Sequence, residues 1–174
     1  AEMSKNRYAD VAVIAALKPA LAALNAALPE AYERLGKPDL SGWWRYLNRL
    51  RETYPLGWTE PTDGFMAPQE VISKLSSIAG PEAIYVTGVG QHQMWAAHYL
   101  TFRRPHTWLN SAGAGTMGYG LPAAMGAKEA CPDRPVWLID GDGCFQMTNQ
   151  ELATCTLNNI PIKVAIINNS SLGM

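Results

Sequence analysis

The stretch PVWLIDGDGCFQMTNQELATCTLNNIPIKVAIINN, residues 135–169, decides the fold. It contains two apolar, β-rich runs, residues 135–140 and 162–168, and turn-forming residues bound each of them. Such runs predict buried strands. Between them, Thr148 has a glutamate at capping-box spacing, which predicts a helix over residues 148–158. A strand, a helix and a second strand predict a parallel pair with a crossover connection.

The alternation of helices and strands continues upstream of this stretch. The predicted helices cover residues 68–79, 91–102 and 117–130, and the predicted strands cover residues 83–89 and 107–110. Together these elements predict an α/β fold with a doubly wound parallel sheet. We expect the fold to be incomplete at both ends. The chain begins without a methionine and stops directly after a strand-like run, as a fragment would.

The amino-terminal third does not show this alternation of helices and strands. Residues 11–28 are rich in alanine and leucine and predict a helix with a buried face. Prolines then punctuate the chain, and a short basic amphipathic helix is predicted from Trp43 to about Tyr54. We therefore predict three parts: a first domain piece over residues 1–28, a linker over residues 29–65 and a larger domain over residues 66–174.

Composition limits the class of protein. Hydrophobic residues make up 48% and charged residues 17% of the 174, as in a globular protein, and the net charge of -1 offers no field for nucleic acid or a membrane surface. The cysteines, Cys131, Cys144 and Cys155, show neither disulfide-framework nor zinc-like spacing. No apolar run predicts a signal peptide or a membrane span. We predict a cytoplasmic location, with small molecules or other protein chains as partners.

Polar residues follow both of the clearest strands, at the edge where parallel sheets bind ligands. The motif GDG (residues 141–143) follows the first strand and NN (residues 168–169) follows the second. Asp142 and Asn169 would offer oxygen ligands to Mg²⁺, which leaves other positions to waters and phosphates. The glycines would let the backbone approach a diphosphate, and the helix near Thr148 would direct its positive end toward that anion. The alternative is two ordinary β-to-α turns.

The GDG and NN motifs at this spacing resemble the signature of the thiamine-diphosphate enzyme superfamily. Three longer segments are similar to the catalytic subunit of acetolactate synthase, also called acetohydroxyacid synthase: GVGQHQMWAA (residues 88–97), GTMGYGLPAAMGAK (residues 115–128) and IDGDGCFQMTNQELAT (residues 139–154). The resemblance covers nearly all of residues 65–174. It extends weakly to residues 1–13, which resemble the end of that family's FAD-carrying middle domain.

The resemblance implies a role for each matching residue. Asp142, the Asn169 side chain and the backbone carbonyl of Ser171 would ligate Mg²⁺. Met117 would lie beneath thiamine diphosphate and hold it bent. The other residues implied to bind the cofactor are Val89, Gly90, Gln91, His92, Gly115, Gly141, Gly143, Cys144, Gly173 and Met174.

Simpler readings of single residues stay open at this point. Met117 is also a common kind of core filler, His92 could cap the helix that follows it, and Cys144 could be a small packing residue.

The resemblance also implies an activity. The family is a transferase that joins decarboxylated pyruvate to a second 2-keto acid in the biosynthesis of the branched-chain amino acids valine and isoleucine. It works as a homodimer or tetramer, with a possible regulatory small subunit. Its activating glutamate lies in an amino-terminal domain, and no residue of this chain matches it. We therefore expect this chain alone to be inactive.

FAD belongs to the complete enzyme in this family. Here Ala16 stands where relatives often carry an acid near the flavin ribose, although Glu2 is a possible flavin neighbour. We do not expect this chain by itself to bind FAD.

Three alternatives remain from the sequence. Residues 113–118 fit the pattern GxGxxG and have Asp140 at a strand end further on, as a dinucleotide-binding Rossmann unit would. Another thiamine-diphosphate enzyme, such as pyruvate oxidase, glyoxylate carboligase or a 2-keto-acid decarboxylase, would share the metal motif. A non-catalytic cofactor-binding piece would share it as well.

Overall fold

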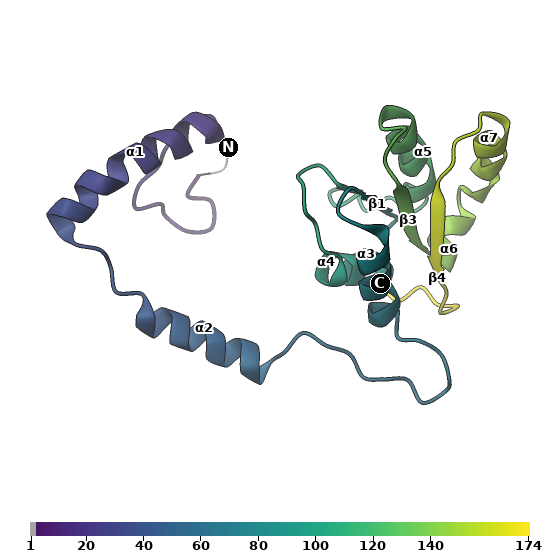
Figure 1. The fold of residues 1–174 in the computed structure, drawn as a ribbon, viewed down its shortest axis with the longest axis horizontal. Coiled ribbons are helices and arrows are strands. Elements are labelled where there is room, and N and C mark those ends of the chain that lie inside the picture. The colour runs from purple at the N-terminus through teal and green to yellow at the C-terminus, as the bar shows by residue number, and fades with distance from the viewer. Residues whose placement is uncertain (1–2) are drawn as a thin grey trace. The chain divides into compact units, whose positions relative to one another are not determined.

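The computed structural model describes residues 3–174, so Ala1 and Glu2, the latter a predicted flavin neighbour, lie outside the described residues. The chain divides into two compact units, Ala1–Leu56 and Gly57–Met174, which are described separately below (Figure 1). Within residues 3–174, no helix combines the length and the apolar content that crossing a bilayer requires.

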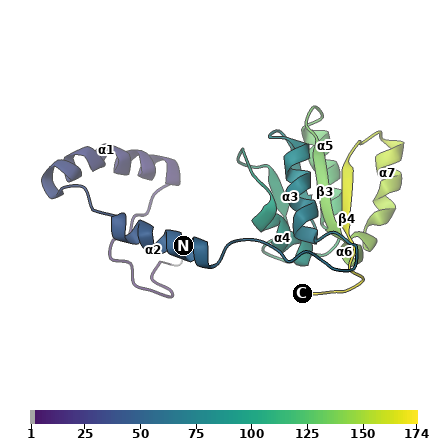
Figure 2. The same ribbon diagram turned by 60° about the horizontal axis from the view of Figure 1, so that its bottom comes forward.

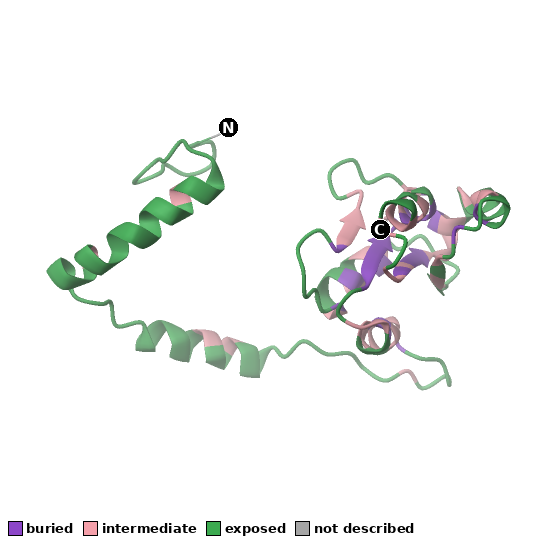
Figure 3. Ribbon diagram, turned by 45° about the horizontal axis from the view of Figure 1, so that its top comes forward, coloured by how far each residue is buried: buried purple, intermediate pink, exposed green. Residues whose placement is uncertain are grey.

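The first unit consists of two helices, α1 (Leu17–Leu35) and α2 (Ser41–Thr53). The predicted bounds of the first helix, residues 11 and 28, are both wrong. α1 begins only at Leu17, continues through Pro29 and ends where Gly36 takes a left-handed backbone (φ 75°). The predicted buried face is also wrong within this unit. Neither helix buries any residue, as the exposed colouring in Figure 3 shows.

The second unit is an α/β domain with a four-stranded parallel sheet in the order β2-β1-β3-β4. Its strands are β1 (Ile84–Thr87), β2 (Trp108–Asn110), β3 (Val136–Gly141) and β4 (Lys163–Ile167). Its helices are α3 (Pro68–Ala79), α4 (Gln91–Tyr99), α5 (Gly120–Ala130), α6 (Asp142–Gln146) and α7 (Leu152–Leu157), with the 3-10 turn η1 (Asn149–Glu151) before α7.

Helices cover both faces of this sheet, because successive side chains of a strand point to opposite sides. On one face, Val86 of β1 belongs to a core cluster with Leu121 of α5 and Cys155 of α7. On the other face, Tyr85 of β1 packs in a cluster with Ile72 of α3. Figure 2 shows α3 and α7 on opposite sides of the strands. The predicted doubly wound parallel sheet is confirmed.

Two predicted helices begin elsewhere in the structure. The helix predicted from Met117 begins only at Gly120, because Gly118 has a left-handed backbone (φ 81°) that a helix cannot include. The helix predicted over residues 148–158 is replaced by η1 and α7, and the chain is already helical in α6.

The predicted capping box is wrong. The Thr148 hydroxyl donates to the Gly118 carbonyl (3.0 Å), and the Glu151 carboxylate accepts from the Thr154 hydroxyl (2.9 Å). Neither side chain therefore caps a helix end; Thr148 instead ties the turn before α5 to the segment after α6.

Candidate functional site

The carboxyl ends of β3 and β4 lie next to each other. The two strands pair in parallel up to Gly141 and Ile167, which are partners in the register. Asp142 follows as the first residue of α6, and Asn169 follows β4 after one residue. The prediction that GDG and NN reach the same edge of one sheet is confirmed.

A cavity of about 270 Å³ lies at this edge of the sheet. Every residue that the resemblance assigned to the cofactor or the metal lines it: Val89, Gly90, Gln91, His92, Gly115, Met117, Gly141, Asp142, Gly143, Cys144, Asn169, Ser171, Gly173 and Met174. Sequence reasoning missed Trp95, Ile167 and Leu172, which line it too. In the sequence, Trp95 lies one helical turn after Gln91, and Ile167 and Leu172 lie within two residues of Asn169 and Ser171. This closeness to predicted residues is the signal that could have identified them.

Glycines keep the walls of the cavity close together. A Cβ on Gly143 would lie 2.7 Å from Leu172 Cδ2, and a Cβ on Gly173 would lie 2.3 Å from Gln91 Cδ. Both distances are far below van der Waals contact. A side chain at either position would have to displace the end of the Leu172 or the Gln91 side chain from its place in the cavity wall.

Asn169 joins the end of β4 to the start of α4. Its amide Nδ2 donates to Gln91 Oε1 (3.0 Å), and its Oδ1 accepts from the Ser171 backbone N–H (3.2 Å). A carbonyl oxygen has two lone pairs, so Asn169 Oδ1 keeps one acceptor position for a cation.

The Asp142 carboxylate makes no hydrogen bond or ion pair with any residue in the described part of the chain. Its oxygens are therefore open to a ligand from the cavity. The predicted contribution of the helix near Thr148 is wrong, however. The helix that follows GDG is α6, which begins at Asp142 itself, and Thr148 does not line the cavity.

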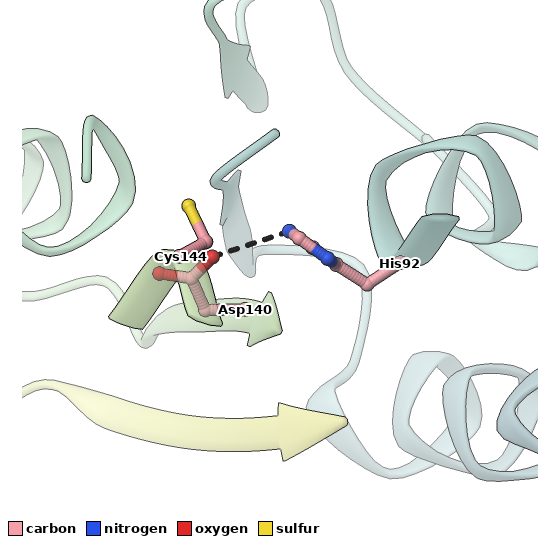
Figure 4. A group of neighbouring side chains, drawn as sticks. All are labelled: His92, Asp140 and Cys144. Carbon is pink, nitrogen blue, oxygen red and sulfur yellow. Dashed lines mark ion pairs between the residues drawn. The ribbon is translucent and has the colours of Figure 1, made fainter. Parts of the chain in front are cut away.

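Beneath the cavity lies a buried group of three polar side chains, His92 of α4, Asp140 of β3 and Cys144 of α6 (Figure 4). His92 Nε2 is 3.1 Å from Asp140 Oδ1. The Cys144 sulfur accepts from the backbone N–H groups of Gly118 (3.1 Å) and Val89 (3.4 Å). The alternative role of His92 as a helix cap is wrong, since α4 has no side-chain cap.

Burial raises the pKa of the Cys144 thiol above its ordinary value. The two backbone N–H groups oppose this rise, and the neighbouring Asp140 carboxylate adds to it. The thiolate form of Cys144 is therefore scarce at neutral pH, which weakens it as a nucleophile.

This environment predicts an order of thiol reactivity. Cys131 is partly exposed, whereas Cys144 and Cys155 are buried. We expect Cys131 to react with iodoacetamide at least about tenfold faster than the other two in the folded chain at pH 7.5. Timed alkylation followed by peptide mass spectrometry measures the three rates, with urea-unfolded chain as the control in which they converge. Rapid labelling of Cys144 in the folded chain would contradict its placement.

The dinucleotide-binding alternative does not fit the structure. Its acidic residue, Asp140, is completely buried and lies against His92, so it cannot reach a ribose. The strand before the glycine pattern, β2, is three residues long, and β1 separates it from the strand that carries Asp140.

Comparison with known proteins gives a consistent result. Residues 88–174 match the family described as thiamine pyrophosphate enzyme, C-terminal TPP binding domain. The whole chain is 56% identical to acetolactate synthase of Mycobacterium leprae (strain TN) and covers 28% of it. It is 49% identical to the acetolactate synthase large subunit of Corynebacterium glutamicum, covering 28%, and 46% identical to chloroplastic acetolactate synthase 1 of Oryza sativa subsp. japonica, covering 27%.

These identities confirm the resemblance inferred from the sequence. The chain spans less than a third of the length of the curated relatives that it matches.

Proposed function

This chain belongs to the thiamine pyrophosphate enzymes, through the C-terminal binding domain of that family, and on this premise we propose that it supplies the cofactor site of an acetolactate synthase large subunit. The observation that carries the proposal is the cavity at the ends of β3 and β4, because the residues expected to hold the cofactor all line it. The similarity to acetolactate synthases over the full chain supports the choice of enzyme.

The donor set fits a diphosphate bound through Mg²⁺. Asp142 offers a carboxylate without a protein partner, and Asn169 Oδ1 keeps a free lone pair. With the Ser171 carbonyl, these are the oxygen ligands that Mg²⁺ accepts while it retains positions for phosphate oxygens. Glycines at 141 and 143 keep the neighbouring wall free of side chains, which suits the close approach of a diphosphate.

Thiamine diphosphate, when bound, supplies the carbon nucleophile and the electron sink that decarboxylation of a 2-keto acid needs. The protein residues position it and keep water away. Val89, Gly90, Gln91 and His92 would line the diphosphate and its approach, and Gly143 and Cys144 would touch the phosphates.

The aminopyrimidine end of the cofactor would meet a less polar wall. Met117 and Gly115 are proposed to contact it, with Gly173 and Met174 at the edge. The Met117 Cε atom would lie 3.8 Å from a Cβ placed on Gly143, and Leu172 faces the same glycine. These apolar atoms would support the bent cofactor and exclude water beside it.

For the complete protein we propose the reaction of the relatives named above. Its substrates would be pyruvate and a second 2-keto acid, and its assembly would be a homodimer or tetramer with a possible regulatory subunit. FAD would bind in the complete enzyme rather than in this chain, and a cytoplasmic location belongs to the same proposal.

The 174-residue chain is expected to bind the cofactor without turnover, because no residue in it matches the activating glutamate of the family. Isothermal titration should show binding of thiamine diphosphate in the presence of Mg²⁺ and no binding of NAD⁺. Acetolactate formed from pyruvate should not exceed a blank that contains cofactor alone. Binding of NAD⁺ without Mg²⁺ would overturn the site assignment, and acetolactate above the blank would overturn the expected inactivity. A product assay on a protein that joins this chain to the remaining domains of an acetolactate synthase large subunit would separate acetolactate synthase from related decarboxylases.

A further inference from the structure

The buried group of His92, Asp140 and Cys144 combines three kinds of metal-ligating atom in one place. An imidazole nitrogen, a carboxylate oxygen and a sulfur lie within 4.8 Å of one another, and they come from three separate elements (Figure 4). The three residues are 4%, 0% and 2% exposed, so water does not satisfy them from the surface. None of the three is among the ligands proposed above for Mg²⁺.

Two atoms of this group are left without hydrogen bonds. Among the residues that the structure describes, neither His92 Nε2 nor Asp140 Oδ2 has a hydrogen-bond partner. His92 Nε2 lies 3.1 Å from Asp140 Oδ1, but the contact does not have the alignment of a hydrogen bond. Buried polar atoms are normally paired, so an unpaired nitrogen beside an unpaired carboxylate oxygen calls for a ligand that can serve both.

Two glycines, Gly88 and Gly120, border the side chains of this group. A Cβ on Gly88 would lie 2.0 Å from Asp140 Oδ1 and 2.3 Å from Cys144 Sγ, and a Cβ on Gly120 would lie 3.1 Å from Asp140 Oδ2. Glycine at position 88 therefore leaves the space in which Asp140 and Cys144 meet, and Gly120 borders the same carboxylate. The Gly118 and Val89 N–H groups donate to the Cys144 sulfur, as second-shell donors do toward a metal-bound thiolate.

The mixed donor set selects one class of ion. Mg²⁺ and Ca²⁺ prefer oxygen ligands alone, whereas Zn²⁺ and Co²⁺ accept nitrogen, oxygen and sulfur together in a tetrahedral arrangement. Three protein ligands leave a fourth position open. His92 and Cys144 also line the cavity, so the fourth ligand would come from the cavity side.

We propose that His92, Asp140 and Cys144 form a binding site for a borderline-soft divalent ion of the Zn²⁺ type, separate in its ligands from the proposed Mg²⁺ site. His92 and Cys144 also line the cavity proposed to hold the diphosphate, but the tests below use the ion alone and need neither thiamine diphosphate nor a 2-keto acid.

Co²⁺ is the probe for the first test, since it reports its ligands by absorption. Titration of the untagged chain with Co²⁺ should give a thiolate-to-cobalt charge-transfer band in the near ultraviolet that saturates at one equivalent. Zn²⁺ should remove the band, and a large excess of Mg²⁺ should leave it. Absence of the band in the unmodified chain would overturn the proposal.

Variants assign the site to its residues. Cys144→Ser should abolish the charge-transfer band, and Asp140→Asn and His92→Gln should each weaken Zn²⁺ binding at least about tenfold. Cys155→Ser is the matched control, because that cysteine is also buried but lies in the cluster with α5, and it should keep the full band. A band of equal strength in Cys144→Ser would place the ion elsewhere and refute the site.

The Cys144→Ser variant could fail to fold, and far-ultraviolet circular dichroism would reveal this. A second test therefore uses only the unmodified chain. One equivalent of Zn²⁺ should slow alkylation of Cys144 in the unmodified chain at least about tenfold and leave the rate at Cys131 unchanged. Equal slowing at both cysteines, or at neither, would refute the proposal.

Discussion

Replacement of Asp142 with alanine is expected to abolish Mg²⁺-dependent binding of thiamine diphosphate, with a loss of affinity of at least about 100-fold. Loss of an outer-shell partner already costs a metal site about 10–100-fold, and Asp142 is the charged member of the proposed inner set. Its carboxylate lines the cavity and has no protein partner to which it is otherwise committed. Isothermal titration of thiamine diphosphate into the chain and the variant, each with and without Mg²⁺, measures the effect.

Asp133→Ala is the matched control for this prediction. Asp133 is an exposed aspartate in the turn after α5 and does not line the cavity, so its removal changes the net charge equally and should leave the affinity unchanged. Equal affinity for thiamine diphosphate in the Asp142→Ala variant and the unmodified chain would refute the assignment of Asp142 as a metal ligand. Binding that is independent of Mg²⁺ in both would show that the diphosphate is held by other groups.

Gly88→Ala is expected to destabilise the second unit by about 3 kcal/mol or more, at the upper end of the range for overpacked cores. The added methyl group would overlap Asp140 Oδ1 at 2.0 Å and Cys144 Sγ at 2.3 Å. Neither the Asp140 nor the Cys144 side chain can easily move away from the added methyl group. Asp140 and Cys144 are both buried, and a Cβ on Gly120 of α5 would lie only 3.1 Å from Asp140 Oδ2. Urea unfolding followed by circular dichroism gives the change in the free energy of unfolding.

Gly126→Ala makes the same chemical change with the opposite expected sign. Gly126 is an exposed residue inside α5, and a Cβ there would meet no atom within 4 Å. Alanine should stabilise the helix by about 0.5–1 kcal/mol, because glycine loses more backbone entropy on folding. A Gly88→Ala variant as stable as the unmodified chain would contradict the predicted overlap with Asp140 and Cys144.

The sheet could be predicted because its signals are local. The apolar runs at residues 135–140 and 162–168 are bounded by turn residues, and the alternation with helices indicates parallel strands. The place of GDG and NN at one edge follows from that topology alone. The identities of the other cavity residues came from family resemblance, and no periodicity in the sequence would have selected Gly115 or Met174.

Other features could not be predicted because tertiary context decides them. Asp140 looks in the sequence like the last residue of an apolar strand, and nothing nearby indicates that it meets His92 and Cys144. The cysteine and histidine spacing indicated no zinc-like structural site, since spacing reports only ligands that share a local motif. The segment after β3 reads as a turn because of its glycines, yet it forms α6 directly from Asp142.

The hydrogen bond between Asn169 and Gln91 joins residues 78 positions apart in the chain. On a ribosome, Gln91 would emerge long before its partner. At about 5–20 residues per second, the interval between them is roughly 4 to 16 seconds. β3 is complete only at Gly141, so its β4 edge stays uncovered for the last part of that time, until β4 (Lys163–Ile167) has been synthesised. The cavity lining includes Asn169 and the residues after it, so a binding-competent domain exists only once the last strand and the segment that follows it have been translated.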